Sequence, residues 1–292
     1  MHVEWIDHVV VPVASVSEAA APYERLGLAL TPEARHQGLG TENRAFFVGG
    51  GVNDFYVELL GIHDREEAAA AGRTLYLEAT ARPRGIVRLM LGVSDVRGAV
   101  VDLAKQGVET AVETVSAADG RKICDVAPLE GIDALGLTAG LVQYTETREA
   151  SHARREAAGR FAHAFTLKRL DHLAMVVSDL EATTRFWNDV LGVPVFGEIR
   201  TPGMIIRQMK IGDAIMEFLA ADGPESRMAG RPAGMASMCA WEVANLDASV
   251  AMARDRGFIP SEPAKGVLPG TRVASIPGSE LAGVGMQLLE YV

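Results

Sequence analysis

A short pattern recurs four times along this chain of 292 residues and limits what the chain can fold into. Each copy opens with an apolar run, passes through a V-x-x-V or V-x-x-L step, and continues as a helix-like stretch that ends at a glycine. In each copy the first valine of the step precedes that glycine by 14 or 15 positions. The four runs are WIDHVVVPVASV, GIVRLMLGVSDV, LDHLAMVVSDL and SMCAWEVANL, which begin at Trp5, Gly85, Leu170 and Ser237. A spacing kept this closely is typical of repeated structural modules, so we predict four related units.

Composition excludes several classes of protein. The formal net charge of −10 argues against nucleic acid and anionic membrane as partners, since both require a basic surface. Cys124 and Cys239 lie far apart and form neither a zinc cluster nor a disulfide framework. The first eleven residues lack the features of a signal peptide, and no apolar run reaches membrane-spanning length. We therefore expect a cytoplasmic protein whose partner is a small molecule, and a homodimer is left open.

The first and third copies predict the same order of elements, β-α-β-β-β. Strands are expected where β-branched and apolar residues cluster, and each helix is expected to stop at its glycine. In the first copy the predicted strands are 6–13, 28–30, 45–48 and 55–60, with a helix from 15 to 27 and a polar loop at 38–44. In the third copy the predicted strands are 170–177, 195–198, 204–210 and 214–219, with a helix at 179–190 and a hairpin turn at 212–213.

Two stretches are predicted to be helical connectors. One separates an N-terminal domain (1–148) from a C-terminal domain (169–292), so the connector itself is 149–168. Its alanine, glutamate and arginine content favours a helix, and its charges are expected to form a solvated face. The alanine-rich stretch from His63 to Arg82 is expected to connect the first two modules.

The motifs resemble those of one superfamily. Dipeptides in the first strands (Asp7-His8 and Asp171-His172) and end strands that carry a glutamate (Glu58-Leu59-Leu60 and Glu217-Phe218-Leu219) resemble the vicinal-oxygen-chelate superfamily. Its members include glyoxalase I, methylmalonyl-CoA epimerase, extradiol dioxygenases and fosfomycin- or bleomycin-resistance proteins. The resemblance covers nearly the whole chain. It implies an α+β fold in which four βαβββ modules form two curled mixed-sheet cups.

The resemblance also implies a divalent metal ion (Zn, Ni, Co, Mn or Fe) held inside a cup. A neutral imidazole and a carboxylate from equivalent strands would bind the ion and leave positions for two substrate oxygens. Strand alternation predicts that His8 faces the same side as Ile6 and Val10, opposite Asp7. When the four modules are aligned, Arg88 and Met238 stand in the place of the histidines, and Gln143 and Gln287 stand in the place of the glutamates. The candidate ligands are therefore His8, Glu58, His172, Glu217, Gln287 and Gln143.

Two arrangements of the modules remain open at this point. If each odd module pairs with the even module that follows, each cup receives one histidine, one glutamate and one glutamine. If modules one and three face each other, His8, Glu58, His172 and Glu217 form a single site.

Each of these residues also has a purely structural interpretation. A histidine in an apolar strand is often a hydrogen-bonded core residue. Arg88 may be the ion-pair partner of a buried glutamate, which would make its site metal-free. Met238 is more typical of core packing than of metal binding. The repetition of a His–Glu pair at matching positions is what favours ligation in modules one and three.

The function implied is that of a glyoxalase-like metalloenzyme: a lyase, isomerase or epimerase that acts on a small oxygenated substrate. The metal would chelate a carbonyl and a neighbouring oxygen and stabilise the enolate formed when a proton leaves the adjacent carbon. Glu217 or Glu58 would be the base. One alternative is a ring-cleaving dioxygenase of the extradiol type, which needs two histidines and a carboxylate in one cup. The other is a non-catalytic protein that binds a small molecule in the cup, as resistance proteins do.

Overall fold

The chain forms two curved eight-stranded sheets, one from each half, in a computed structural model that describes residues 3–49, 54–82, 85–117, 119–226 and 228–292. Strand order is β2-β3-β4-β1-β5-β8-β7-β6 in the first sheet and β10-β11-β12-β9-β13-β16-β15-β14 in the second. Each sheet is thus two modules joined by an antiparallel pair of strands, β1 with β5 and β9 with β13. The prediction of two curled mixed-sheet cups is confirmed, and each odd module pairs with the even module that follows it.

The elements of the first half are β1 (Trp5–Pro12), α1 (Val16–Leu26), β2 (Ala34–His36), β3 (Thr41–Val48), β4 (Phe55–Ile62), α2 (Arg65–Ala70), α3 (Thr74–Ala81), β5 (Arg88–Gly92), α4 (Val96–Lys105), β6 (Glu113–Ser116), β7 (Lys122–Leu129), η1 (Asp133–Leu135) and β8 (Ala139–Tyr144). The connector contains α5 (Arg148–Ala157). The second half contains β9 (Arg169–Val176), α6 (Leu180–Arg185) continued by η2 (Phe186–Val190), β10 (Val195–Thr201), β11 (Met204–Ile211), β12 (Ala214–Ala220), β13 (Gly234–Glu242), α7 (Leu246–Asp255), β14 (Ala264–Lys265), β15 (Thr271–Ile276), η3 (Gly278–Glu280) and β16 (Gly285–Tyr291).

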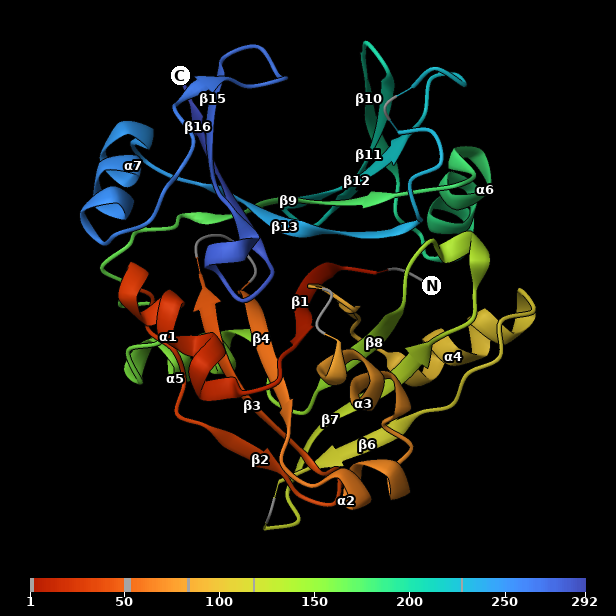
Figure 1. The fold of residues 1–292 in the computed structure, drawn as a ribbon. Coiled ribbons are helices and arrows are strands. Elements are labelled where there is room, and N and C mark those ends of the chain that lie inside the picture. The colour runs from red at the N-terminus through yellow and green to blue at the C-terminus, as the bar shows by residue number, and fades with distance from the viewer. Residues whose placement is uncertain (1–2, 50–53, 83–84, 118, 227) are drawn as a thin grey trace.

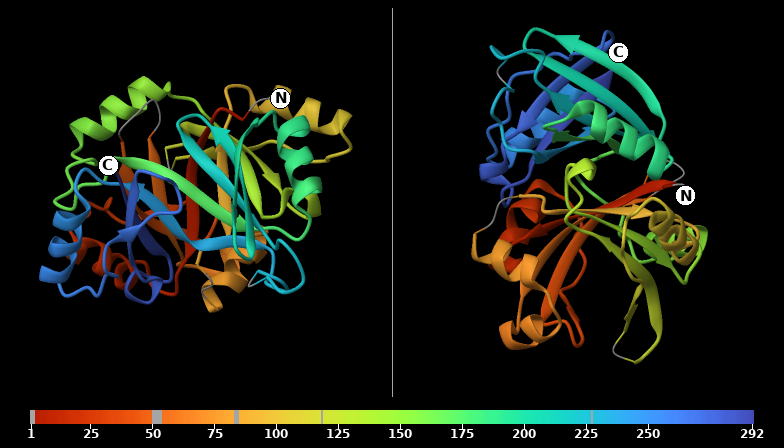
Figure 2. Two further views of the ribbon diagram at one scale, coloured as in Figure 1. Left: turned by 90° about the horizontal axis from the view of Figure 1, so that it is seen from above. Right: turned by 90° about the vertical axis from the view of Figure 1, so that its right-hand side faces the viewer.

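The two sheets stand back to back, with their concave faces pointing in opposite directions (Figures 1 and 2). The convex faces and the helices on them share one hydrophobic core that runs through both halves, from Val3 to Leu288. Hydrogen bonds also cross between the halves: the Tyr23 hydroxyl donates to the Leu281 carbonyl at 2.8 Å, and Trp187 Nε1 donates to the Leu135 carbonyl at 3.0 Å. This shared core leaves both concave faces available for other uses.

The helices begin and end as the sequence pattern predicts. Ser15 caps α1 by accepting from the Glu18 amide, and Gly27 ends that helix in the left-handed conformation at φ 98°. The predicted helix at 179–190 is present as α6 and the π-helical turn η2. No helix in the described part of the chain combines the length and apolarity needed to cross a membrane.

Two local predictions are wrong. The segment 28–30 forms only an isolated bridge, between Leu30 and Phe46, and the strand that follows α1 is β2 at 34–36. The expected polar loop at 38–44 is largely part of β3, which begins at Thr41 and pairs with β4 along its whole length. Cross-strand pairing has overridden the polar composition of this segment.

The stretch from His63 to Arg82 is helical, as predicted, but it is more than a connector. It forms α2 and α3, and Figure 1 shows both within the concave side of the first sheet. Tyr76 of α3 is buried there in a hydrophobic cluster with Val10, Leu60 and Met90. The concave face of the first half is therefore filled by the chain itself.

Both thiols should be inert in the folded protein. Burial raises the pKa of Cys124 and of Cys239 to about 12, so at pH 8 only about one thiol in 10⁴ is ionised. We expect almost no reaction with a water-soluble disulfide reagent at pH 8, and stoichiometric reaction of both thiols in guanidinium chloride. Cys124→Ser and Cys239→Ser, labelled separately, assign the signals. Labelling of the folded protein within minutes would contradict the burial described here.

Candidate active site

A β-bulge shapes the first strand of each half. In the pairing of β1 with β5, Ile6 lies opposite Leu91 and His8 lies opposite Met90, so Asp7 is an extra residue. The same shift occurs at Asp171, between Leu170 and His172, in the pairing of β9 with β13. A bulge bends the strand and redirects side chains. Simple alternation is therefore wrong at this point: Ile6 packs in the shared core, whereas His8 lies on the concave face with Val10.

The bulged aspartates hold the neighbouring histidine rings. Asp7 Oδ1 lies 2.6 Å from His8 Nδ1, and Asp171 Oδ1 lies 2.7 Å from His172 Nδ1. A tyrosine from the last strand of each half also donates to the aspartate, Tyr144 at 3.0 Å and Tyr291 at 2.7 Å. A carboxylate bound to Nδ1 fixes the orientation of the ring and leaves Nε2 facing the cup.

The surroundings of both aspartates favour the ionised form. Burial by itself would raise the pKa of Asp171, but the hydrogen bonds with His172 and Tyr291 outweigh it, and the pKa is lowered. Asp7 shows the same balance: burial opposes ionisation, while the hydrogen bonds with His8 and Trp5 lower its pKa. In the sequence these aspartates stand out only as part of the Asp-His motif. Their role in orienting the histidines required the bulge to be seen.

A glutamate faces each histidine across the cup. His8 Nε2 lies 3.7 Å from Glu58 Oε2, and His172 Nε2 lies 3.8 Å from Glu217 Oε2. The other oxygen of each glutamate accepts a hydrogen bond from a side-chain amide, that of Asn43 for Glu58 and that of Gln208 for Glu217. The gap exceeds the length of a hydrogen bond. In both cups, Nε2 and Oε2 are therefore not hydrogen-bonded to each other.

Only the C-terminal cup is shown to contain a cavity at its His–Glu pair. A space of about 310 Å³ is bordered by His172, Glu217, Gln287 and Met238. The His172 side chain is 17% exposed, against 9% for His8. Burial by itself would lower the pKa of His172, but Asp171, Glu217 and a hydrogen bond with Gln287 outweigh it, and the pKa is raised. A cation at Nε2 would therefore compete with a proton.

The N-terminal cup differs in its second module. Arg88 is paired with Glu130 and lies over the Tyr76 ring, 5.1 Å from its centroid. Arg88 is not the ion-pair partner of Glu58, because its guanidinium is paired with Glu130, whose side chain is exposed to solvent. Tyr56 stacks on the His8 ring at 4.2 Å. The Tyr76 side chain of α3 packs on the same face of the sheet, against Val10, Leu60 and Met90.

The alignment that gave Gln143 the position equivalent to Glu58 is wrong. Gln143 faces α4, where its side-chain oxygen accepts from the Val96 amide at 3.1 Å and its amide donates to the Ser94 carbonyl. Strand register gives the true equivalence. Val10 in the first module corresponds to Met90 in the second. Val10 pairs with Glu58, whereas Met90 pairs with Gly140. The position that Gln287 holds in the C-terminal cup is therefore occupied by Gly140, which has no side chain.

His8 and His172 belong to different sheets that open in opposite directions, so the single site with four ligands from modules one and three does not exist. The C-terminal cup brings together His172, Glu217 and Gln287. Within the described residues, no three side chains of the types His, Cys, Asp or Glu converge on a point that could hold a metal. A cation in this cup would depend on one imidazole, one carboxylate and one neutral amide.

These donors fit a divalent cation of borderline character. Imidazole nitrogen with carboxylate and amide oxygens is a donor set that such ions accept. The atoms that would bind it, Nε2 of His172 and Oε2 of Glu217, lie 3.8 Å apart. Gln287, the third donor, is hydrogen-bonded to the His172 ring. The supporting bonds from Asp171 and Gln208 have the form expected around metal ligands.

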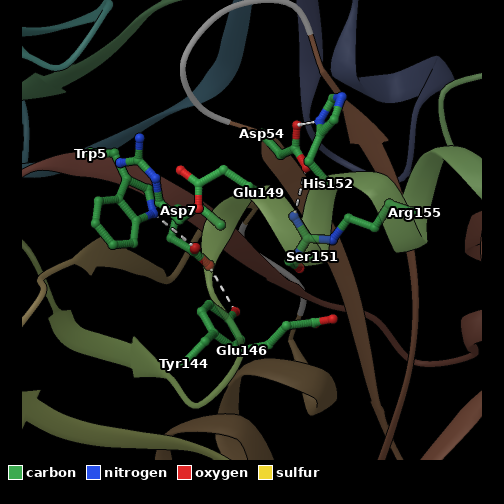
Figure 3. Close-up of a pocket in the computed structure, with 10 residues that line it drawn as sticks. Trp5, Asp7, Asp54, Tyr144, Glu146, Glu149, Ser151, His152 and Arg155 are labelled. Carbon is green, nitrogen blue, oxygen red and sulfur yellow. Dashed lines mark hydrogen bonds and ion pairs between the residues drawn. The ribbon is translucent and has the colours of Figure 1, made fainter.

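A second cavity, of about 280 Å³, lies between α5 and the first sheet (Figure 3). Asp54 pairs there with His152 at 2.7 Å and with Arg155 at 3.1 Å. Arg155 also lies over the Phe47 ring, 4.4 Å from its centroid. The charges of the connector are therefore not simply a solvated face, because this ion-pair network fastens α5 to the first half.

Comparison with known proteins agrees with this architecture. A family model described as "Glyoxalase-like domain" matches residues 6–162, and one described as "Glyoxalase/Bleomycin resistance protein/Dioxygenase superfamily" matches residues 171–274. The chain belongs to this superfamily, the vicinal-oxygen-chelate superfamily.

Curated relatives are shorter than this chain. Mitochondrial methylmalonyl-CoA epimerase of Bos taurus is 32% identical over 132 residues, which cover 42% of this chain and 75% of that protein. The enzyme of the same name from Homo sapiens is 30% identical over 125 residues, which cover 40% and 70%. A solved structure of a hypothetical protein from Staphylococcus aureus covers 98% of both chains with a TM-score of 0.63 at 11% identity, which shows the fold alone.

Replacing one histidine at a time should show which of the two cups binds a metal ion. We expect His172→Ala to weaken the binding of Mn²⁺ or Zn²⁺ by more than roughly 100-fold, since loss of a ligand exceeds the effect of losing a supporting contact. His8→Ala is the matched control and should bind as the parent protein does. Calorimetric titration of both variants provides the measurement. Equal losses in the two variants would contradict the assignment of the site to the C-terminal cup.

Proposed function

We propose that the C-terminal cup is the active site of an isomerase or epimerase that moves a proton on the carbon next to a carbonyl. The observation that carries the proposal is the open cavity at His172, Glu217 and Gln287, in a cup whose histidine and glutamate are already oriented by hydrogen bonds. Similarity to methylmalonyl-CoA epimerases supports this class of reaction. The substrate is a small oxygenated molecule or the reacting end of a larger one.

His172, Glu217 and Gln287 would hold a divalent metal ion. When bound, the ion supplies a Lewis acid that polarises the substrate carbonyl and lowers the cost of removing the neighbouring proton. The protein contributes the orientation of its donors. Asp171 fixes the His172 ring, and Gln208 fixes the Glu217 carboxylate through a hydrogen bond of 2.8 Å.

Glu217 is the base in this proposal. Among the described residues that border the cavity it is the one carboxylate, and it would act as the base when its Oε2 is displaced from the ion. It would accept the proton from the substrate carbon and deliver it to the neighbouring carbon, which is general acid–base catalysis by a positioned side chain. Inversion at a single carbon would require a second proton donor on the opposite face. The apolar walls of the cup limit access of water to that proton.

The ring-cleaving alternative is not supported by the side chains present. It requires two histidines and a carboxylate in one cup, and His172 is the one histidine that borders this cavity.

A binding protein without catalysis is the second candidate. It is favoured by the absence of three converging strong ligands in the described part of the chain. Purified protein that binds ligands but exchanges no proton would support it.

Solvent exchange tests the proposal. A panel of acyl thioesters and branched ketones, with methylmalonyl-CoA among them, is incubated with the protein in D₂O, and loss of the α-proton signal is followed by NMR. We expect exchange with at least one compound, and a decrease of about 10²- to 10⁴-fold in Glu217→Gln, the range for loss of a general base. Glu58→Gln, the equivalent change in the filled cup, should leave the rate unchanged. Exchange that survives in Glu217→Gln would exclude Glu217 as the base.

A further inference from the structure

The cavity of the C-terminal cup is polar at one place and apolar elsewhere. His172, Glu217 and Gln287 form the polar place. Thr271 also borders the cavity, but its hydroxyl donates to the Leu268 carbonyl at 2.6 Å and is already satisfied. Apart from Lys265, the other described residues of the border are apolar, among them Ala174, Ile206, Leu219, Met238, Val273 and Leu289.

One wall of the cavity is a hydrophobic cluster in its own right. Met204, Ile206 and Met228 are each less than 9% exposed and pack together on the concave side of the second sheet. Leu219 and Ile199 pack against the same cluster. A charged group placed against this wall would lose its hydration and gain no partner, which is costly.

Cations are scarce around this cavity. Lys265 is the one lysine or arginine among the described residues that border it, and it belongs to the short edge strand β14, where it is exposed to solvent. The floor of the cup carries Met238 at the position that Arg88 holds in the first half. Among the described residues of the border, Lys265 is therefore the one cation that could meet a carboxylate, and it stands at the exposed edge of the cup.

We infer that the substrate of this cup has an uncharged, apolar body next to its reacting carbonyl, and carries no second carboxylate in that part. This deepens the proposed function and rests on it for the identity of the reacting end. It also separates this chain from its relatives, whose names specify methylmalonyl-CoA, a compound with a carboxylate on the acyl group. A charged carrier group would have to lie outside the cavity.

Matched probes test this inference without catalysis. Octanamide, which is neutral, and suberate, the dicarboxylate of the same chain length, are titrated into the full-length protein in the presence of a chelator. Protein labelled with [methyl-¹³C]methionine reports binding through the signals of Met204 and Met238, assigned with Met204→Leu and Met238→Leu. We expect octanamide to shift both signals, and suberate to bind at least about 10-fold more weakly. Suberate carries two carboxylates where octanamide carries no charge, and the carboxylate at the apolar wall would be buried without a partner.

Two variants decide what causes the preference. Leu219→Arg places a cation against the apolar wall and should improve the binding of suberate relative to octanamide by at least about fivefold. Methionine signals outside the cavity show whether that variant is folded. Lys265→Met should leave the preference unchanged, and it keeps the inference testable if Leu219→Arg does not fold. Suberate that binds the parent protein as well as octanamide does, and loses that affinity in Lys265→Met, would overturn the inference.

This result is independent of the proton-exchange assay. Neither probe has to react, and the chelator removes any contribution from a metal. Preference for octanamide without proton exchange would leave the ligand class standing and remove the proposed reaction. Exchange on a carboxylated acyl group, with equal binding of the two probes, would remove this inference and keep the reaction.

Discussion

One backbone irregularity organises the candidate site. Because Asp7 and Asp171 are extra residues in β-bulges, each can reach the Nδ1 atom of the histidine that follows it. In a regular strand, successive side chains point to opposite faces and this contact could not form. The bulge thus converts an Asp-His dipeptide into an oriented imidazole with Nε2 directed into the cup. The tyrosines that bond the same aspartates link this orientation to the last strand of each half.

The two halves share this arrangement and have diverged around it. Both keep a histidine and a glutamate separated by 3.7–3.8 Å, and both hold the glutamate with a side-chain amide. The first half contains α2 and α3, and Tyr76 of α3 packs on its concave face. In the first half the second module has Arg88 and Gly140. The equivalent positions of the second half are occupied by Met238 and Gln287. The first half therefore retains the geometry of a site in a closed cup, while the second retains both the geometry and the cavity.

The sequence predicted the architecture better than the site. Four repeats and their spacing were sufficient to predict four related units, because hydrophobic periodicity and glycine stops are local signals. The two cups were implied by the resemblance to the superfamily, and the pairing of the modules was left open. Three features could not be predicted. The bulge depends on cross-strand register, the position of Gly140 against Glu58 depends on the same register, and the filling of the first cup by α3 depends on tertiary packing. The alignment that selected Gln143 failed for this reason: a shift of three residues along a strand moves a side chain to the opposite face.

Paramagnetic broadening by Mn²⁺ tests the central claim, that the second half alone keeps a working cup. Met238 borders the C-terminal cavity, and Met90 lies opposite His8 in the filled N-terminal cup. In protein labelled at methionine methyl groups, the account predicts that stoichiometric Mn²⁺ broadens the Met238 signal and leaves the Met90 signal sharp. Broadening of Met90 with Met238 unaffected would contradict it, and so would the absence of broadening at both.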